Sequence, residues 1–382
     1  MPDLAAQMLT PTGGFTIDGM MMRYNIFVPR LYNLCKSLGM AAGKIMPSRA
    51  FCSDENQGYP IIMIAKHFGT FPFNHGRVGG VVATNRNGPH AEHGENLVII
   101  QASHVGYDPE SKKFGAYKRL QTENHGMSDT CGKIYGVIDW YQSEYDFAAK
   151  NIFIEKKNNT VLISIDNHLL REDLNEGLGL HLHKLIKENE DKKFIAVELH
   201  STAKTYVASD WLINKLKEKL NPGKKFAIGK NLSSEMFYYK HKIQPTLEGA
   251  DHLELNLIQY MPLIITSAAP AMLAAQINTQ VEFDRVFRTL VKEKGYQGKN
   301  LVFIAGLNID ISPKDEQIFP LTKFVPWAAY IQKADGQSYI MEQKELMIEL
   351  EKQSTSNPDQ IDLEAAIQKM QAAQEVKIDC CP

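Results

Sequence analysis

The segment Leu97–Ala102 (LVIIQA) constrains the fold of this chain more than any other feature of the sequence. It is a continuous apolar run bounded by polar residues, which is typical of a β-strand buried on both faces. Strands of this kind occur in parallel sheets that helices cover on both sides. Leu301–Ile311 (LVFIAGLNIDI) is another strong strand candidate. We therefore predict an α/β fold with a mainly parallel central sheet flanked by helices.

The remaining segments alternate between helical and strand-like patterns. Residues 1–20 are expected to form a loose N-terminal arm, and Gly69–Gly80 is a glycine-rich loop in which backbones can approach closely. The sequence after Gly336 is polar and helix-forming, so this tail is expected either as two helices on the body or as a mobile extension. Further strands are predicted at Ser48–Cys52, Val161–Ile165 and Phe194–Leu199, and helices at Met21–Leu38, Pro60–Phe68, Gly132–Lys150 and Leu169–Asn189. Two more regions are expected to be mainly helical, with prolines as breaks: Trp211–Leu220 and Leu253–Lys294.

Composition narrows the classes of function. The 382 residues carry a formal net charge of −2, so no broad attraction to nucleic acid or to an anionic membrane is expected. No apolar run reaches the roughly 18 residues of a membrane span, because Pro262 and Pro270 interrupt the longest stretches. The N-terminus has no secretion-signal pattern, and we expect a cytoplasmic protein. The five cysteines are too few for a disulfide scaffold and fit reduced thiols that can bind metal.

Cys52, His104 and Cys131 are candidate ligands of a zinc ion. Catalytic zinc takes three protein ligands, often thiolates and imidazoles, and keeps a fourth position for water. Cys52 and His104 each follow a predicted strand, and reactive groups gather at the carboxyl ends of strands in open α/β sheets. Cys131 opens a predicted helix, where the helix dipole favours a thiolate. Spacing alone gives no C-x-x-C or H-E-x-x-H motif, and composition alone favours two small buried cysteines and a hydrogen-bonded core histidine.

Several short motifs follow one another in the order of a known family. Phe51–Asn56 reads FCSDEN, Ser103–Gly106 reads SHVG, Gly115–Arg119 reads GAYKR, and Cys131-Gly132 comes next. In this order and at these distances they resemble the limiting-CO2-inducible B/C family, the theta-class relatives of β-carbonic anhydrases. Leu301–Leu321 also resembles the closing strand of that family and the segment that follows it.

The resemblance spans roughly residues 20–335 and implies a β-carbonic-anhydrase-like catalytic domain at 21–335. An insertion at about 190–245 and the tail at 336–382 look like additions to that domain. The implied activity is the reversible hydration of CO2 to bicarbonate by zinc-bound hydroxide, with Zn2+ as cofactor. The implied assembly is a homodimer.

The same resemblance assigns roles to individual residues. The two cysteines and the histidine match the zinc ligands of the family, and Asp54 matches its active-site carboxylate. In ordinary β-carbonic anhydrases the arginine partner of that carboxylate comes from a C-x-D-x-R segment, but here Asn56 stands in its place. Arg119 is therefore the implied partner of Asp54, with Arg77 as the alternative. A competing role for Asp54 is to cap the following helix, and both roles are compatible.

Other functions and roles remain open at this stage. A homologue that binds zinc without catalysis would act as a regulatory or interaction protein. A zinc hydrolase of another type would use Glu198 and His200, in the segment VELHS. Phe71 and Phe73 either line an apolar pocket for CO2 or belong to the core. The proton shuttle would be a histidine, with His125 as one candidate and His67, His75, His90 and His93 as others.

Overall fold

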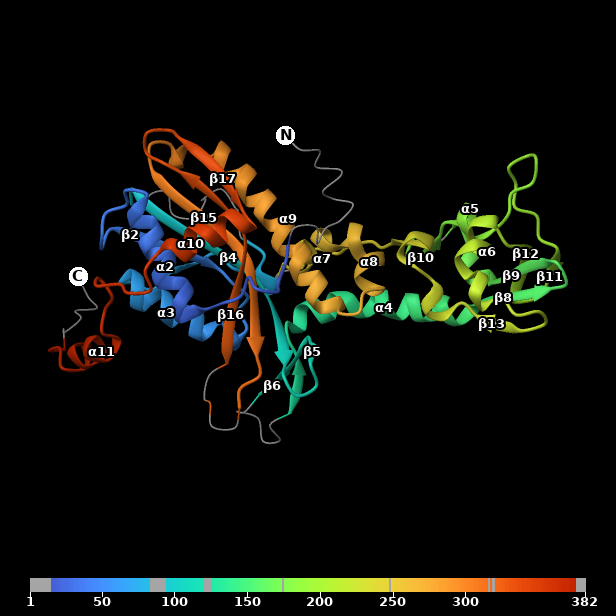
Figure 1. Cartoon of the computed structure of the whole chain (residues 1–382), viewed down its shortest axis with the longest axis horizontal. Coiled ribbons are helices and arrows are strands. Elements are labelled where there is room, and N and C mark those ends of the chain that lie inside the picture. The colour runs from blue at the N-terminus through green and yellow to red at the C-terminus, as the bar shows by residue number, and fades with distance from the viewer. Residues whose placement is uncertain are drawn as a thin grey trace, which may run out of the picture.

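The computed structural model describes residues 15–82, 94–119, 126–173, 175–246, 249–314, 317 and 320–375. An eight-stranded sheet forms the body of the molecule (Figure 1), and six of its strands follow one another across it, while β17 pairs with β16 and β5 (Lys113–Phe114) pairs with β4. Its strands lie in the order β1 (Met22–Arg23), β16 (Leu321–Gln332), β15 (Asn300–Ile311), β4 (Asn96–Asp108), β2 (Ile45–Ala50) and β3 (Phe73–Asn74). The run from β15 to β3 is parallel, as predicted, while β1, β16 and β17 (Ser338–Glu342) add antiparallel pairs.

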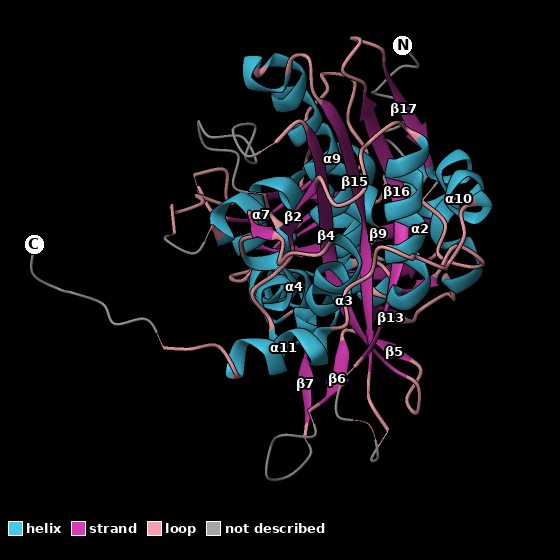
Figure 2. Ribbon diagram, turned by 90° about the vertical axis from the view of Figure 1, so that its left-hand side faces the viewer, coloured by secondary structure: helices cyan, strands magenta, loops and turns pink. Residues whose placement is uncertain are grey.

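Helices cover both faces of this sheet, which gives three layers (Figure 2). Alternate residues of the central strand β4 point to opposite faces. Leu97 and Ile99 pack in the cluster on the side of α9 (Pro270–Lys292), whereas Val98 and Ile100 pack in the cluster formed with α2, α3 and α10. These three helices span Tyr24–Ser37, Gly58–Phe68 and Gln343–Lys352. Burial on both faces explains why this part of the strand is a run of apolar residues.

The two longest parallel strands, β4 and β15, are paired in register over their whole shared length. This pairing places Asn308 beside His104. One prediction needs correction here. His104 does not follow the end of its strand, because β4 continues to Asp108 and buries His104 completely.

A second sheet lies at the other end of the elongated molecule (Figure 1). It is antiparallel and five-stranded, in the order β11 (Glu198–Leu199), β12 (Ala203–Val207), β9 (Thr160–Asp166), β8 (Ile152–Lys157) and β13 (Lys225–Ala227). The predicted strand Val161–Ile165 exists, but it belongs to this sheet. The physical reason is local, since Asn158 adopts a positive φ of 51° and turns β8 directly back into β9 as a hairpin.

Two further predictions in this region were wrong. Leu169–Asn189 is not one helix, since β10 (Gly177–Leu180) pairs with β14 (Phe237–Lys240) and only Leu182–Leu185 is α-helical. Within β10, Leu178 and Leu180 are buried at a spacing of two residues, which is a strand period. Phe194–Leu199 is not a buried strand, because only its last two residues pair, at the edge of the second sheet.

The first helix of the tail, α10, packs against the body through Leu346, Met347 and Leu350. The segment after it is also anchored, because Asp359 pairs with Lys36 at 2.7 Å. Helix α11 (Leu363–Gln371) has no buried residue. Residues 1–14 of the predicted arm lie outside the described residues, as do the two cysteines at 380 and 381. No helix in the described part of the chain is both long and apolar enough to cross a bilayer.

Candidate metal centre

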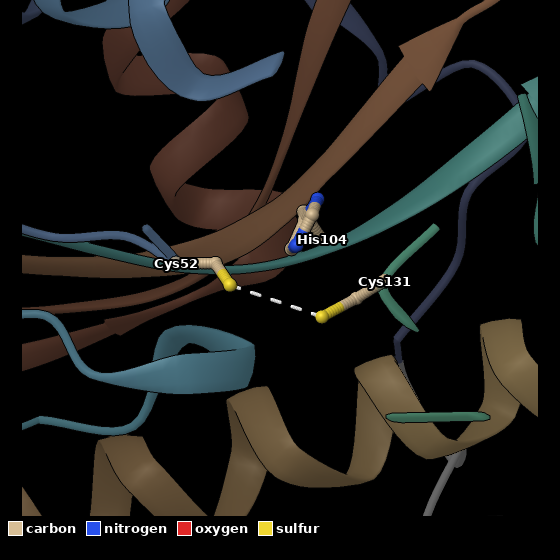
Figure 3. Close-up of side chains that lie close together, drawn as sticks. All are labelled: Cys52, His104 and Cys131. Carbon is tan, nitrogen blue, oxygen red and sulfur yellow. Dashed lines mark hydrogen bonds between the residues drawn. The ribbon is translucent and has the colours of Figure 1, made fainter. Parts of the chain in front are cut away.

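The main chain brings Cys52, His104 and Cys131 together in the interior (Figure 3). Cys52 lies just after β2, His104 lies within β4, and Cys131 is the N-cap residue of α4 (Gly132–Asn151). One ligand atom from each lies within 4.8 Å of the others, and all three residues are buried. In the part of the chain that the structure describes, this is the one such group of histidines, cysteines and carboxylates. Three residues that are 52 and 27 positions apart in the sequence thus share one point in space.

The geometry of the group fits a tetrahedral zinc ion. The sulfur atoms of Cys52 and Cys131 are 3.8 Å apart. Two sulfurs bound to one tetrahedral zinc at about 2.3 Å each would lie about 3.8 Å from one another. His104 can supply the third donor, since its Nε2 is buried and has no hydrogen-bond partner among the described residues. An unpaired buried nitrogen beside two thiols is the environment that a metal ion would complete.

The other ring nitrogen of His104 is held by a residue that the sequence analysis did not single out. Nδ1 lies 2.8 Å from Oδ2 of Asp310, on the neighbouring strand β15. A carboxylate on the second nitrogen is the usual support of a metal-binding histidine. Burial opposes the charge on His104, but Asp310 and Cys52 together raise the pKa of its imidazole. Asp310 was detectable in principle, because Asn308 and Asp310 follow the long apolar run of β15 and share one face of that strand.

The two thiols differ in their ease of ionisation. The hydrogen bond with Cys131 and burial raise the pKa of Cys52 to about 12. The same contact lowers the pKa of Cys131, and the backbone N–H groups of Ile134 and Lys133 lower it further against the effect of burial. Cys131 is thus the thiol of the pair that ionises more easily, and the two backbone N–H groups act in the direction expected at the start of a helix.

These shifts predict that metal binds more tightly as the pH rises. Without metal, Cys52 carries its proton at neutral pH, as an ordinary thiol does and more firmly because its pKa is raised, while the raised pKa of His104 keeps its imidazole protonated. Metal must displace both protons, and each released proton is worth about tenfold in affinity per pH unit. We expect the zinc dissociation constant to fall by about tenfold to 100-fold between pH 6.5 and 7.5. Chelator competition at the two pH values measures it, and a pH-independent constant would contradict the assignment of the ligands.

A pair of glycines shapes the loop beside Cys52. The N–H of Gly79 donates a hydrogen bond of 3.2 Å to the Cys52 sulfur. Gly80 has a φ of +80°, and a Cβ there would lie 2.2 Å from the carbonyl oxygen of Ala102 in β4. The predicted close approach of backbones in this loop is therefore confirmed. Asn278 of α9 ties the loop to the strand, since its Nδ2 donates to the Gly79 carbonyl at 3.1 Å and to Ser103 Oγ at 2.8 Å.

Gly80→Ala should destabilise the protein strongly. The new methyl group would collide with the backbone of a central strand, and alanine disfavours positive φ. We expect a loss of about 2–4 kcal/mol in the free energy of unfolding. Gly136→Ala is the matched control, because that helical glycine has open space around its Cβ position. Urea unfolding should show a slight gain for the control, and equal stabilities for the two variants would refute the steric argument.

The carboxylate and the arginine that the family resemblance pairs lie next to each other. Arg119 Nη2 is 3.5 Å from Oδ1 of Asp54, while Oδ2 of Asp54 is 4.0 Å from His104 Nε2. Arg119 also pairs with Glu55 and donates from Nε to Ser128 Oγ at 2.7 Å. The predicted helix cap was wrong, since the Asp54 side chain makes no capping hydrogen bond in the segment that follows it.

The surroundings of this pair distinguish it from the alternatives. The side chain of Arg77 lies instead against Gly249, at the start of α7 (Ala250–Leu257). Tyr117 is buried beside the site, with the Arg119 guanidinium 5.8 Å from its ring centre. Burial raises the pKa of Tyr117, and the charges of Asp310 and Asp54 add to the effect. Arg119 is therefore the arginine that the fold delivers to Asp54.

Other candidates lie away from this centre or outside the described residues. Phe71 is 68% exposed, so it is not a core residue. His67 is buried, and Asn357 of the tail donates a hydrogen bond from Nδ2 to the His67 carbonyl oxygen and lies 3.3 Å from its Nδ1. Glu198 and His200 form an exposed pair, 3.3 Å apart, on the second sheet and are not part of the group that can hold a metal. Three histidines that were considered as proton shuttles, His90, His93 and His125, lie outside the described residues.

Two cysteine thiols and one imidazole, buried beside parallel strands, form a group that can hold a metal ion. Comparison with solved structures finds LCIB and its homologues, the family that the motifs resemble. PtLCIB4, a homologue of the limiting CO2-inducible protein LCIB, is 13% identical, with a TM-score of 0.49 over 88% of this chain and 99% of its own. LCIB itself is 13% identical, with a TM-score of 0.44 over 85% and 96%. No family model and no curated protein sequence matches the chain.

Proposed function

We propose that this protein is a zinc-dependent carbonic anhydrase that interconverts CO2 and bicarbonate. The observation that carries the proposal is the buried group of Cys52, His104 and Cys131, with the Asp54 carboxylate 4.0 Å from the free histidine nitrogen. The geometry fits zinc, and the zinc would supply a water molecule whose pKa is brought close to neutrality. As thiolates, Cys52 and Cys131 would balance the charge of the ion and, with His104, would hold it in the protein interior.

The remaining residues act on the reactants. Asp54 accepts the proton of the attacking water at a carboxylate oxygen and so directs a lone pair toward CO2. Arg119 holds the Oδ1 atom of Asp54, with its Nη2 3.5 Å away. This contact keeps the carboxylate oriented toward the attacking water and prevents it from becoming a ligand of the metal. Arg119 is itself braced by Ser128 and Glu55, so its position does not depend on Asp54 alone.

Stopped-flow measurement of CO2 hydration on zinc-loaded protein tests this proposal. We expect turnover well above the rate of buffer alone and loss of turnover when a chelator removes the metal. Protein that binds one zinc per chain but hydrates no CO2 would refute the enzymatic proposal and favour a regulatory or interaction role. Homodimer formation and a cytoplasmic location remain predictions from the sequence.

A further inference from the structure

A chain of buried hydrogen bonds leads away from the metal centre and joins four segments of the chain. We call it the Asp310 relay. It comprises Tyr24 of α2, Gln57 beside α3, Asn308 and Asp310 of β15, and Thr322 of β16, all of them at most 1% exposed. None of these residues can act as a ligand in the group of Cys52, His104 and Cys131 as it stands, so they touch the metal centre only through His104. Each buried polar group costs free energy unless it is hydrogen-bonded, so a network of this size in a core suggests that it has a function beyond stability.

The relay begins at Asp310, which accepts hydrogen bonds on both oxygens. Thr322 Oγ1 donates to Oδ1 at 2.9 Å. Gln57 Nε2 donates to Oδ2 at 2.9 Å, and His104 Nδ1 lies 2.8 Å from the same oxygen. Gln57 and Thr322 both donate to Asp310, so its carboxylate acts as an acceptor toward His104 as well. When His104 gives up one proton to bind a metal ion, the remaining proton therefore belongs on Nδ1, and the lone pair of Nε2 is available to the metal.

The orientation of each further member follows from the previous one. Gln57 must turn its amide nitrogen toward Asp310, so its oxygen faces Asn308, whose Nδ2 donates to it at 2.6 Å. Asn308 must then present its own oxygen on the other side, where Tyr24 donates its hydroxyl proton at 2.7 Å. Tyr24 ends the relay, because a phenol has a single proton to donate. No member can flip its amide without placing two acceptors or two donors against each other.

We propose that the Asp310 relay is a positioning device that holds His104 in its metal-binding tautomer and thereby sets the metal affinity of the centre. This inference rests on the metal centre of the proposed function but not on CO2 hydration. Partners behind a ligating histidine are typically worth about tenfold to 100-fold in metal affinity. Behind Asp310, the relay adds the amides of Gln57 and Asn308 and the phenol of Tyr24. Because each donor fixes the orientation of the next group, a substitution at Tyr24 should still change how firmly His104 is oriented.

The test is zinc affinity by chelator competition on folded protein, with Asp310→Asn as the main variant. The amide keeps the shape of the carboxylate but faces three donors with only one good acceptor, so affinity should fall by about tenfold to 100-fold. Asp108→Asn is the matched control, a carboxylate-to-amide change on the strand that carries His104, hydrogen-bonded to Ser111 rather than to the relay. The control should stay within about twofold of the native protein.

A second variant keeps the test decisive if Asp310→Asn does not fold. Tyr24→Phe removes one hydroxyl group at the far end of the relay, and we expect about threefold to tenfold weaker zinc binding, the worth of one buried hydrogen bond. Native affinity in folded Asp310→Asn, or in Tyr24→Phe if only that variant folds, would overturn the proposal. Cys52→Ser in the same assay separates the two ideas. If it also leaves affinity unchanged, the metal centre itself is wrong; if it alone weakens binding, only the relay is wrong.

Discussion

Cys52→Ser should abolish tight zinc binding and with it any CO2 hydration. A serine hydroxyl stays protonated at neutral pH and is a poor zinc ligand, whereas the thiol ionises on the metal. The loss of a direct ligand should exceed the effect of an outer partner, so we expect affinity to fall by at least about 100-fold. Zinc content after dialysis against a weak chelator measures this, and His104→Ala and Cys131→Ser should behave alike.

Cys35→Ala is the matched control for that experiment. Cys35 is also a free, fully buried cysteine, but it lies in α2 and packs among apolar residues away from the metal centre. Its removal should cost stability and leave one zinc per chain. Equal zinc content in the Cys35 and Cys52 variants would show that the proposed centre does not hold the metal.

Asp54→Asn should separate catalysis from metal binding. Asp54 lies beside the group that can hold a metal, and the amide cannot accept the proton of the attacking water, so we expect kcat to fall by at least about 100-fold with full zinc content. Arg119→Met should also lower turnover, because Asp54 loses the guanidinium 3.5 Å away. Stopped-flow hydration and metal analysis on the same samples give both quantities.

The alternative arginine provides the control for this pair. Arg77→Met changes a side chain that lies against Gly249 rather than Asp54, so turnover should remain close to that of the native protein. A variant pattern in which Arg77 matters and Arg119 does not would require a different partner for Asp54. Undiminished turnover in Asp54→Asn would remove the carboxylate from the mechanism.

The central sheet was predictable because its strands carry a strong local signal. Burial on both faces gives β4 and β15 long apolar runs at Leu97–Ile100 and Leu301–Leu307. Strand β16 was not recognised, since Lys323 and Pro326 interrupt its pattern. The proline is accommodated because the pairing of β15 and β16 shifts register at Ala305 and Gly306, opposite Pro326. Such an irregularity depends on the partner strand and leaves no trace in the local sequence.

The second sheet shows the opposite situation, in which a signal was present but was interpreted as part of one large sheet. The two asparagines after Lys157 mark a tight hairpin, and Ile152 and Ile154 alternate with more exposed residues in the first of its strands. Alternation of this kind is typical of antiparallel strands with one solvated face. A separate antiparallel sheet could therefore have been predicted from the sequence.

For the metal centre, the motifs identified the residues that meet, but not the residues behind them. Cys52, His104, Cys131, Asp54 and Arg119 lie together as the family order implies. Gln57 and Asp310 reach His104 only through tertiary pairing, across 47 and 206 positions of sequence. Periodicity can place Asp310 on a face of its strand, but the register between β4 and β15 decides that this face meets His104.

X-ray absorption at the zinc edge of the zinc-loaded protein tests the proposed metal centre most directly, because it counts the atoms around the ion. Two sulfur neighbours at about 2.3 Å, with nitrogen or oxygen neighbours at about 2.0–2.2 Å completing a four-coordinate shell, are the expected result. The sulfur atoms of Cys52 and Cys131, 3.8 Å apart, and Nε2 of His104 would provide three of those neighbours. A shell without sulfur, or one with four sulfurs, would contradict the assignment.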